Sequence, residues 1–247
     1  MRHYWLMVAT LAALALSGPS RAERSAEDLA RDARDKPQQV MQFAGIEPGM
    51  QVVDLFAGGG YYSELLSERV GPAGRVLLYN NPAYAAYGKQ GLVQRFTEGR
   101  LSNVERRVSD TTAMGLGEAS FDRAILVMSL HDLYWVDEKE GWPEIDRDQF
   151  LEQVVKALKP GGALLVVDHA AKPGSGFSAV NALHRIDEQF VQSTLQRHGL
   201  TLEKTSDILR QPEDDHSQNV FAPPIRGKTD RFVHLYRKSA AAAKASD

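Results

Sequence analysis

The stretch Gln51-Val-Val-Asp-Leu-Phe-Ala-Gly-Gly-Gly-Tyr-Tyr-Ser-Glu-Leu-Leu66 decides the fold of this chain. Two β-branched residues and an acid run into three consecutive glycines, and a helical pattern follows them. This order predicts a buried strand, a tight turn and the start of a helix. Glycine lets the backbone of such a turn approach a ligand closely, because no Cβ stands in the way. The stretch therefore predicts an α/β protein that binds a nucleotide-type cofactor.

Strand and helix patterns alternate on both sides of this turn, which predicts a doubly wound, mostly parallel sheet. The predicted strands are Gln51–Leu55, Arg75–Tyr79, Val104–Val108, Phe121–Met128, Ala163–Val167, Thr201–Leu209 and Arg231–Arg237. The predicted helices cover 25–36, 37–45, 62–70, 150–158 and 187–198. Lys159-Pro-Gly-Gly162 is expected to end the preceding helix before the fifth strand, and residues 211–229 form a long irregular segment.

Ligands of a doubly wound sheet bind outside the carboxyl ends of its strands. The residues at these ends are Asp54 to Gly60, Asn80 and Asn81, Asp110, Ser129 to Asp132, and Asp168 to Lys172. The sequence therefore places the binding site among them.

Composition excludes several classes of function. The chain has 247 residues, of which 43% are hydrophobic, so a single globular domain can bury a sizeable core. It contains no cysteine, which rules out disulfides and thiol chemistry. The formal net charge is −3 and the body of the chain has no basic run, so nucleic acid is not an expected partner.

The first 22 residues have the pattern of a secretory signal. Arg2 and His3 precede an apolar run from Leu6 to Leu16, and Ser17-Gly-Pro-Ser-Arg-Ala22 supplies a cleavage site. The run is too short to span a bilayer, so no stable membrane anchor is expected. We therefore expect an exported domain over 23–238, in the periplasm of a Gram-negative bacterium. Residues 239–247 read as a disordered tail.

Six short motifs together point to a family. They are Val53-Asp-Leu-Phe-Ala-Gly-Gly-Gly60, Val108-Ser-Asp110, Phe121-Asp-Arg-Ala-Ile125, Leu158-Lys-Pro-Gly-Gly-Ala-Leu164, His184-Arg-Ile-Asp187 and Thr229-Asp-Arg-Phe-Val233. With them the chain resembles class I S-adenosylmethionine-dependent methyltransferases over residues 26–238. Within that family it is similar to a group of predicted methyltransferases that carry signal peptides.

The resemblance implies a Rossmann-like, seven-stranded sheet of order 3-2-1-4-5-7-6 with its last strand antiparallel. It implies S-adenosyl-L-methionine as cofactor, with Asp110 accepting a hydrogen bond from the adenine amino group. The cofactor-binding residues that it implies are Asp54, Phe56, Gly58, Gly59, Gly60, Asn80, Asp110, Thr111 and Ser129. Two of them depart from the family pattern. Phe56 replaces the first glycine of the turn, and Asn80 stands where an acid usually holds the ribose hydroxyls.

His131 is the candidate general base, because it follows the fourth strand and an unperturbed imidazole titrates near neutral pH. Asp132 is the second candidate catalytic residue. The candidate substrate-contacting residues are Tyr61, Tyr134, Trp135, His169, His184 and Arg185. Each also has a structural interpretation: the aromatics can belong to the core, and Arg185 can pair with Asp187.

Three functions remain open at this point. The first is an exported methyltransferase that acts on a small molecule or an envelope component by in-line methyl transfer. The second is a non-catalytic protein that binds an adenosyl ligand on the same fold. The third is a metal-dependent enzyme that uses His131, His169 and His184, although none of these histidines has the short spacing typical of ligands. No metal site is predicted for that reason.

Overall fold

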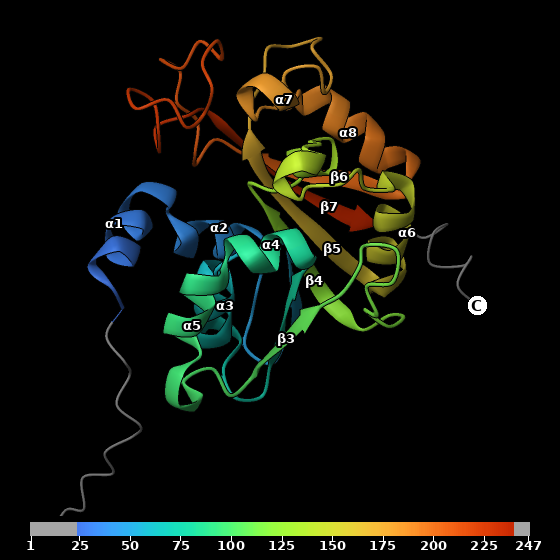
Figure 1. The fold of residues 1–247 in the computed structure, drawn as a ribbon. Coiled ribbons are helices and arrows are strands. Elements are labelled where there is room, and N and C mark those ends of the chain that lie inside the picture. The colour runs from blue at the N-terminus through green and yellow to red at the C-terminus, as the bar shows by residue number, and fades with distance from the viewer. Residues whose placement is uncertain (1–23, 240–247) are drawn as a thin grey trace, which may run out of the picture.

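The structure is a computed structural model, and it describes residues 24–239 (Figure 1). The predicted signal segment and all of the predicted tail except Ser239 lie outside the described residues. None of the helices within residues 24–239 is long and apolar enough to cross a membrane.

Seven strands form one sheet of order β3-β2-β1-β4-β5-β7-β6 (Figure 1). They are β1 (Gln51–Leu55), β2 (Arg75–Asn80), β3 (Val104–Val108), β4 (Phe121–Val127), β5 (Leu158–His169), β6 (Leu200–Ser206) and β7 (Arg231–Lys238). The first five strands pair in parallel. β7 is antiparallel to both β5 and β6. The predicted fold class and strand order are therefore confirmed.

The helices are α1 (Ala26–Asp35), α2 (Pro37–Phe43), α3 (Tyr61–Val70), α4 (Pro82–Tyr87), α5 (Lys89–Arg95), α6 (Arg147–Ala157), α7 (Val180–Leu183) and α8 (Glu188–Arg197), with 3₁₀ turns η1 (Thr97–Gly99), η2 (His131–Leu133) and η3 (Glu138–Glu140). Ser25 caps α1 and Asp187 caps α8, as predicted. Helices α4 and α5 were not predicted from the sequence. Asn81 caps α4 by accepting from the Tyr84 N–H at 2.9 Å, with Pro82 in the first turn.

Several predicted boundaries differ from the structure, and the start of the fifth strand differs most. Lys159 to Gly162 was expected to separate a helix from a strand that begins at Ala163; helix α6 does end at Ala157, but β5 already begins at Leu158. Leu158 pairs with Phe121, and the register then shifts before Arg123 pairs with Ala163. β5 therefore contains the Pro-Gly-Gly segment as an irregularity near its start, and a bulge is one of the places where a strand tolerates proline.

The sheet is covered on both faces, so the core has two layers. Side chains alternate between the faces of each strand, and neighbouring Val52 and Val53 enter different layers. One layer packs the sheet against α2 and α3, and the other packs it against α6 and α8. The strands therefore read as nearly continuous apolar runs, and polar groups concentrate where the strands end.

Backbone from α4 and α5 covers the glycine turn that follows β1. A Cβ placed on Gly88 would lie 2.2 Å from the carbonyl carbon of Gly58, and one on Gly59 would lie 3.3 Å from the Cα of Gly91. The turn and the covering segment can approach so closely because both contribute glycines. This contact fixes the position of α4 and α5 over the end of β1.

We predict that Gly88→Ala destabilises the protein by about 1–3 kcal/mol, although alanine favours helix more than glycine does. Gly88 has an ordinary φ of −82°, so the loss comes from the contact with Gly58 and not from backbone strain. Chemical denaturation measures it. Gly59→Ala is the matched comparison, since its contact is looser, and it should lose less. Equal stability of Gly88→Ala and the parent chain would contradict the close contact.

Candidate functional site

Asn80 holds the glycine turn to the end of β2. Its side-chain oxygen accepts from the Gly58 N–H at 2.9 Å, and its side-chain nitrogen donates to the Gly58 carbonyl at 3.0 Å. The residue is fully buried. An amide can satisfy a backbone donor and a backbone acceptor at once, which a carboxylate cannot. The asparagine at this position therefore binds the turn, and its predicted contact with a ribose stays a prediction.

Phe56 has a backbone conformation that is typical of glycine. Its φ is +53°, in the left-handed region that side chains other than glycine rarely adopt. The ring is buried between Tyr84, at a centroid distance of 4.7 Å, and Phe150, at 5.0 Å. Packing on both faces of the ring compensates for the strained backbone. Phe56 therefore belongs to the core beneath the turn.

Asp54 is buried behind the same turn. Its carboxylate accepts from the Ser63 hydroxyl of α3 at 2.6 Å. Burial raises the pKa of Asp54 to about 7, although the bond from Ser63 acts in the other direction. A buried carboxyl group that is only partly ionised at neutral pH is unusual in a protein core. We therefore expect Asp54 to affect the stability of the protein as well as the conformation of the turn.

Unpartnered hydroxyls lie at the ends of the two strands that flank this region. Within the described residues, the buried Oγ atoms of Ser109 and Ser129 have no hydrogen-bond partner. Ser129 follows β4, and Ser109 precedes Asp110 at the end of β3. Asp110 is exposed, and its Oδ1 accepts from the backbone and hydroxyl of Thr112. Buried polar groups without partners are rare, so these hydroxyls mark a place where a polar ligand can bind.

Arg231 adds a buried cation at the same edge. It pairs with Asp35 of α1, its Nη1 lying 2.9 Å from Oδ1, and both side chains are 2% exposed. Among the residues that the structure describes, its Nε and Nη2 atoms have no partner. A buried guanidinium with free N–H groups suits a carboxylate. Thr111, in contrast, uses its carbonyl to accept from Gln153 at 2.8 Å.

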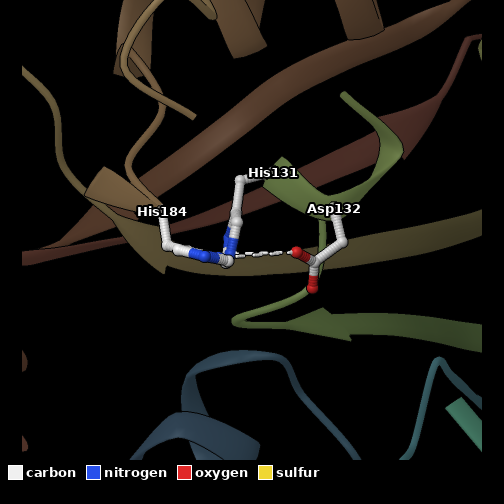
Figure 2. A group of neighbouring side chains, drawn as sticks. All are labelled: His131, Asp132 and His184. Carbon is white, nitrogen blue, oxygen red and sulfur yellow. Dashed lines mark ion pairs between the residues drawn. The ribbon is translucent and has the colours of Figure 1, made fainter. Parts of the chain in front are cut away.

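His131 is held by Asp168, which is fully buried at the end of β5. The Nδ1 atom of His131 lies 2.7 Å from Oδ1 of Asp168, and the His131 N–H donates to the other carboxylate oxygen at 2.8 Å. The Nε2 atom of His131 faces Asp132, 3.2 Å from its Oδ1 (Figure 2). The hydroxyl of Tyr84 donates to the other oxygen of Asp132. Two carboxylates thus flank one imidazole, and the Tyr84 hydroxyl is the last member of this series of polar contacts.

This pairing alters the protonation of the group. Burial lowers the pKa of His131, but Asp132 and Asp168 outweigh it and raise the pKa to about 9. Burial also favours a proton on Asp168, yet the His131 imidazolium holds the pKa of that carboxyl below its usual range. His131 therefore carries a proton at neutral pH in this arrangement. Its role as a base stays a prediction.

His184 faces His131 from the end of α7, and the two ring centroids lie 5.6 Å apart (Figure 2). Burial lowers the pKa of His184 to about 4, so its imidazole is neutral. Aromatic rings line the surface beside it. Trp135 lies 5.1 Å from the His184 ring and Phe221 lies 4.9 Å from it. The cluster therefore combines ionisable groups with an apolar wall that can hold a planar molecule.

Other predicted substrate residues have structural partners. The Nδ1 of His169 lies 2.8 Å from the Thr229 hydroxyl, and burial lowers the pKa of His169 to about 3. Tyr61 donates to Asp32 of α1 at 2.6 Å. Tyr134 stacks on Phe177 at 5.0 Å. Their contacts with substrate stay predictions.

Arg185 is buried and contacts the long irregular segment between β6 and β7. It donates to the carbonyls of Ala170 and Gln218 and pairs with Asp214 at 2.9 Å. Asp187, its suggested partner, instead caps α8. Arg185 therefore anchors residues 211–229 to the sheet, and these residues contain no helix or strand, as predicted.

Two residues of the cluster, Asp168 and Tyr84, were not among the candidate catalytic or substrate-contacting residues. The position of Asp168 after the fifth strand was a usable signal, since strand ends were expected to carry the site. Tyr84 also lies near a strand end, but its helix, α4, and its contact with Asp132 were not predicted.

Comparisons with known proteins identify the family to which this chain belongs. A family model described as "Methyltransferase domain" matches residues 46–214. The ubiquinone/menaquinone biosynthesis C-methyltransferase of Hydrogenovibrio crunogenus is 28% identical over 132 residues, which is 53% of this chain and 46% of that protein. The enzyme of the same name from Idiomarina loihiensis is 26% identical over 165 residues, 66% of this chain and 58% of that protein. The chain spans about half the length of the curated relatives it matches.

Solved structures share the fold at low identity. A SAM-dependent methyltransferase from Aquifex aeolicus aligns with a TM-score of 0.58 and 19% identity, covering 84% of this chain and 98% of that chain. The 1,6-didemethyltoxoflavin-N1-methyltransferase of Burkholderia thailandensis, solved with S-adenosylhomocysteine, aligns with a TM-score of 0.53 and 16% identity. It covers 85% of this chain and 80% of that chain.

We predict that part of the stability of this protein decreases as pH rises through the range set by Asp54. The folded chain keeps a proton on Asp54 up to about pH 7, whereas an unfolded aspartate releases it near its ordinary pKa of 3.8. The folded state therefore binds more protons in this window, and its free energy of unfolding falls as pH increases. The effect is up to a few kcal/mol.

Urea denaturation between pH 4 and 8 measures this slope in the parent chain and in Asp54→Asn. The difference between the two curves isolates Asp54 from all other titrating groups. The parent should lose stability relative to the variant as pH rises. Parallel curves would show that Asp54 is ionised throughout.

Proposed function

This chain belongs to the methyltransferase-domain family of S-adenosylmethionine-dependent enzymes, and from that premise we propose that it is exported and methylates a small molecule or an envelope component. The observation that carries the proposal is the set of unpartnered polar groups near the glycine turn, namely the Ser109 and Ser129 hydroxyls after β3 and β4 and the free N–H groups of Arg231 at the start of β7. We place the cofactor there and its methyl acceptor at His131 and Asp132.

The residues at this edge fit the cofactor. Asp110 is exposed and can accept from an adenine amino group, and the Ser109 and Ser129 hydroxyls can bond polar atoms of the adenosine. The free N–H groups of Arg231 suit the carboxylate of the methionine end. A bound S-adenosylmethionine supplies a methyl group already activated on a sulfonium. The protein then has to position the acceptor and exclude water.

Binding also requires the covering segment to move. Gly88 and Gly91 occupy the outer surface of Gly58 and Gly59, so a ligand that touches that backbone displaces α4 and α5. Tyr84 lies on α4, and its hydroxyl donates a hydrogen bond to Asp132. Movement of α4 therefore exposes the turn and frees an oxygen of Asp132 at the same time.

The acceptor end combines a proton-binding group with an apolar wall. Asp168 orients His131 and Asp132 lies beside it, while Trp135 and Phe221 flank His184. A planar acceptor with an ionisable oxygen or nitrogen matches these groups. The curated relatives named as ubiquinone/menaquinone C-methyltransferases support an aromatic acceptor for this chain too.

Export rests on the basic start, the apolar run and the cleavage site within the first 22 residues. We place the mature domain, 23–238, in the periplasm and assign the chain to the group of methyltransferases that carry signal peptides. An acceptor from the cell envelope is consistent with that location.

A second candidate function is adenosyl-ligand binding without catalysis. The observation that favours it is the covered glycine turn, which leaves the close-approach surface of the family motif in contact with Gly88 and Gly91. Ligand binding without methyl transfer to any acceptor would support this function.

We predict that Asp110→Ala lowers the affinity for S-adenosylmethionine by about ten-fold or more, because a hydrogen bond to a charged acceptor is lost. Isothermal titration calorimetry of the full chain, refolded from denaturant to remove any carried ligand, measures it. Asp207→Ala removes a carboxylate that is 93% exposed and is the matched control. Unchanged affinity in Asp110→Ala would remove the adenine role.

A further inference from the structure

Three side chains at the acceptor end point their ligand atoms at one small volume (Figure 2). They are His131 and Asp132 of η2 and His184, which follows α7. Their ligand atoms all lie within 4.8 Å of one another. More than 50 residues separate His184 from the other two in the sequence, so only the fold brings the three together.

The spacing of these atoms suits a metal ion. Donor atoms bound to one tetrahedral Zn²⁺ lie about 3.3–3.5 Å apart, given metal–ligand distances near 2.0–2.2 Å. The Nε2 of His131 is 3.2 Å from Oδ1 of Asp132, and the Nδ1 of His184 is 4.0 Å from the same oxygen. Metal binding requires His184 to move so that the longer distance shortens. That side chain is 15% exposed and has more freedom than His131, which is 4% exposed.

The surroundings prepare each donor for this role. The Nδ1 of His131 lies 2.7 Å from the Asp168 carboxylate, so Nδ1 keeps its proton, and Nε2 is the ligand atom once the metal ion displaces the proton that the imidazolium carries there. The Tyr84 hydroxyl holds the oxygen of Asp132 that does not face the histidines. Hydrogen bonds that ligating histidines donate to carboxylates are a common feature of metal sites, because they fix the tautomer and the ring orientation.

The local charge also favours a cation. Asp132 and Asp168 supply two carboxylates at the centre of the cluster, and His184 adds a second imidazole. Arg185 and Arg231, the nearest buried cations, are paired with Asp214 and Asp35 respectively. Two imidazoles and a carboxylate are a donor set that binds Zn²⁺ and neighbouring divalent transition metals.

We propose that His131, Asp132 and His184 form a three-ligand site for a divalent transition metal ion. This set replaces the His131, His169 and His184 set that the sequence suggested, since Nδ1 of His169 is engaged by Thr229. Three protein ligands leave coordination positions open, as in sites where metals bind a substrate. An oxygen or nitrogen of the methyl acceptor fits such a position. That last role rests on the proposed function, whereas metal binding does not.

The test is a metal titration of the full chain, made without an affinity tag of histidines and treated first with a chelator. Zn²⁺ binding is followed by calorimetry, and Co²⁺ binding by the visible absorption that a low-symmetry site of nitrogen and oxygen donors produces. We expect one ion per chain. His184→Ala should weaken binding at least ten-fold, and Asp168→Asn should weaken it ten- to a hundred-fold through the orientation of His131.

His198→Ala is the matched control, because His198 also lies beside a carboxylate, at 3.1 Å from Asp148, but outside the cluster. It should bind the metal as the parent does. Circular dichroism of each variant verifies folding, and His184→Ala, at the most exposed ligand, keeps the test available if Asp168→Asn unfolds. Absence of stoichiometric binding, or equal affinity in His184→Ala and His198→Ala, would overturn the proposal. Neither result depends on methyl transfer, so failure of the metal site leaves the proposed function to its own test.

Discussion

The Asp168 carboxylate is the group on which the candidate site depends. It is fully buried at the end of β5 and accepts from the His131 backbone, the His131 ring and the His169 backbone. Leaving a buried carboxylate without such donors would be costly, so the end of β5 and the start of η2 have to stay together. His131 is thereby fixed in place, and Asp132 follows from its position next in the chain.

The second constraint is the contact between the glycine turn and the segment after β2. Asn80 forms two hydrogen bonds with the backbone of Gly58 through its side-chain oxygen and nitrogen, and Gly88 packs against the same residue. Phe56 fills the space beneath the turn and stacks on Tyr84, which in turn bonds Asp132. The proposed cofactor end and the proposed acceptor end of the site are thus both in contact with one helix, α4. A change in the position of α4 reaches both.

The sequence predicted the fold well because the fold depends on local patterns. Apolar runs, the glycine turn and the caps at Ser25 and Asp187 each act over a few residues. The site was less predictable, since its contacts join distant residues. Asp35 and Arg231 lie 196 positions apart, and no local pattern reports their pairing. Asn80 and Phe56 were visible as departures from the family motif, but only the structure relates them to Gly58 and Tyr84.

The central claim is that this edge of the sheet transfers a methyl group. The most direct measurement incubates the full chain with S-adenosylmethionine labelled in its methyl group and a small-molecule extract of the cell envelope. The account predicts label in an organic acceptor with the parent chain and far less with Asp110→Ala. A parent chain that binds S-adenosylmethionine yet leaves every acceptor fraction unlabelled would contradict it.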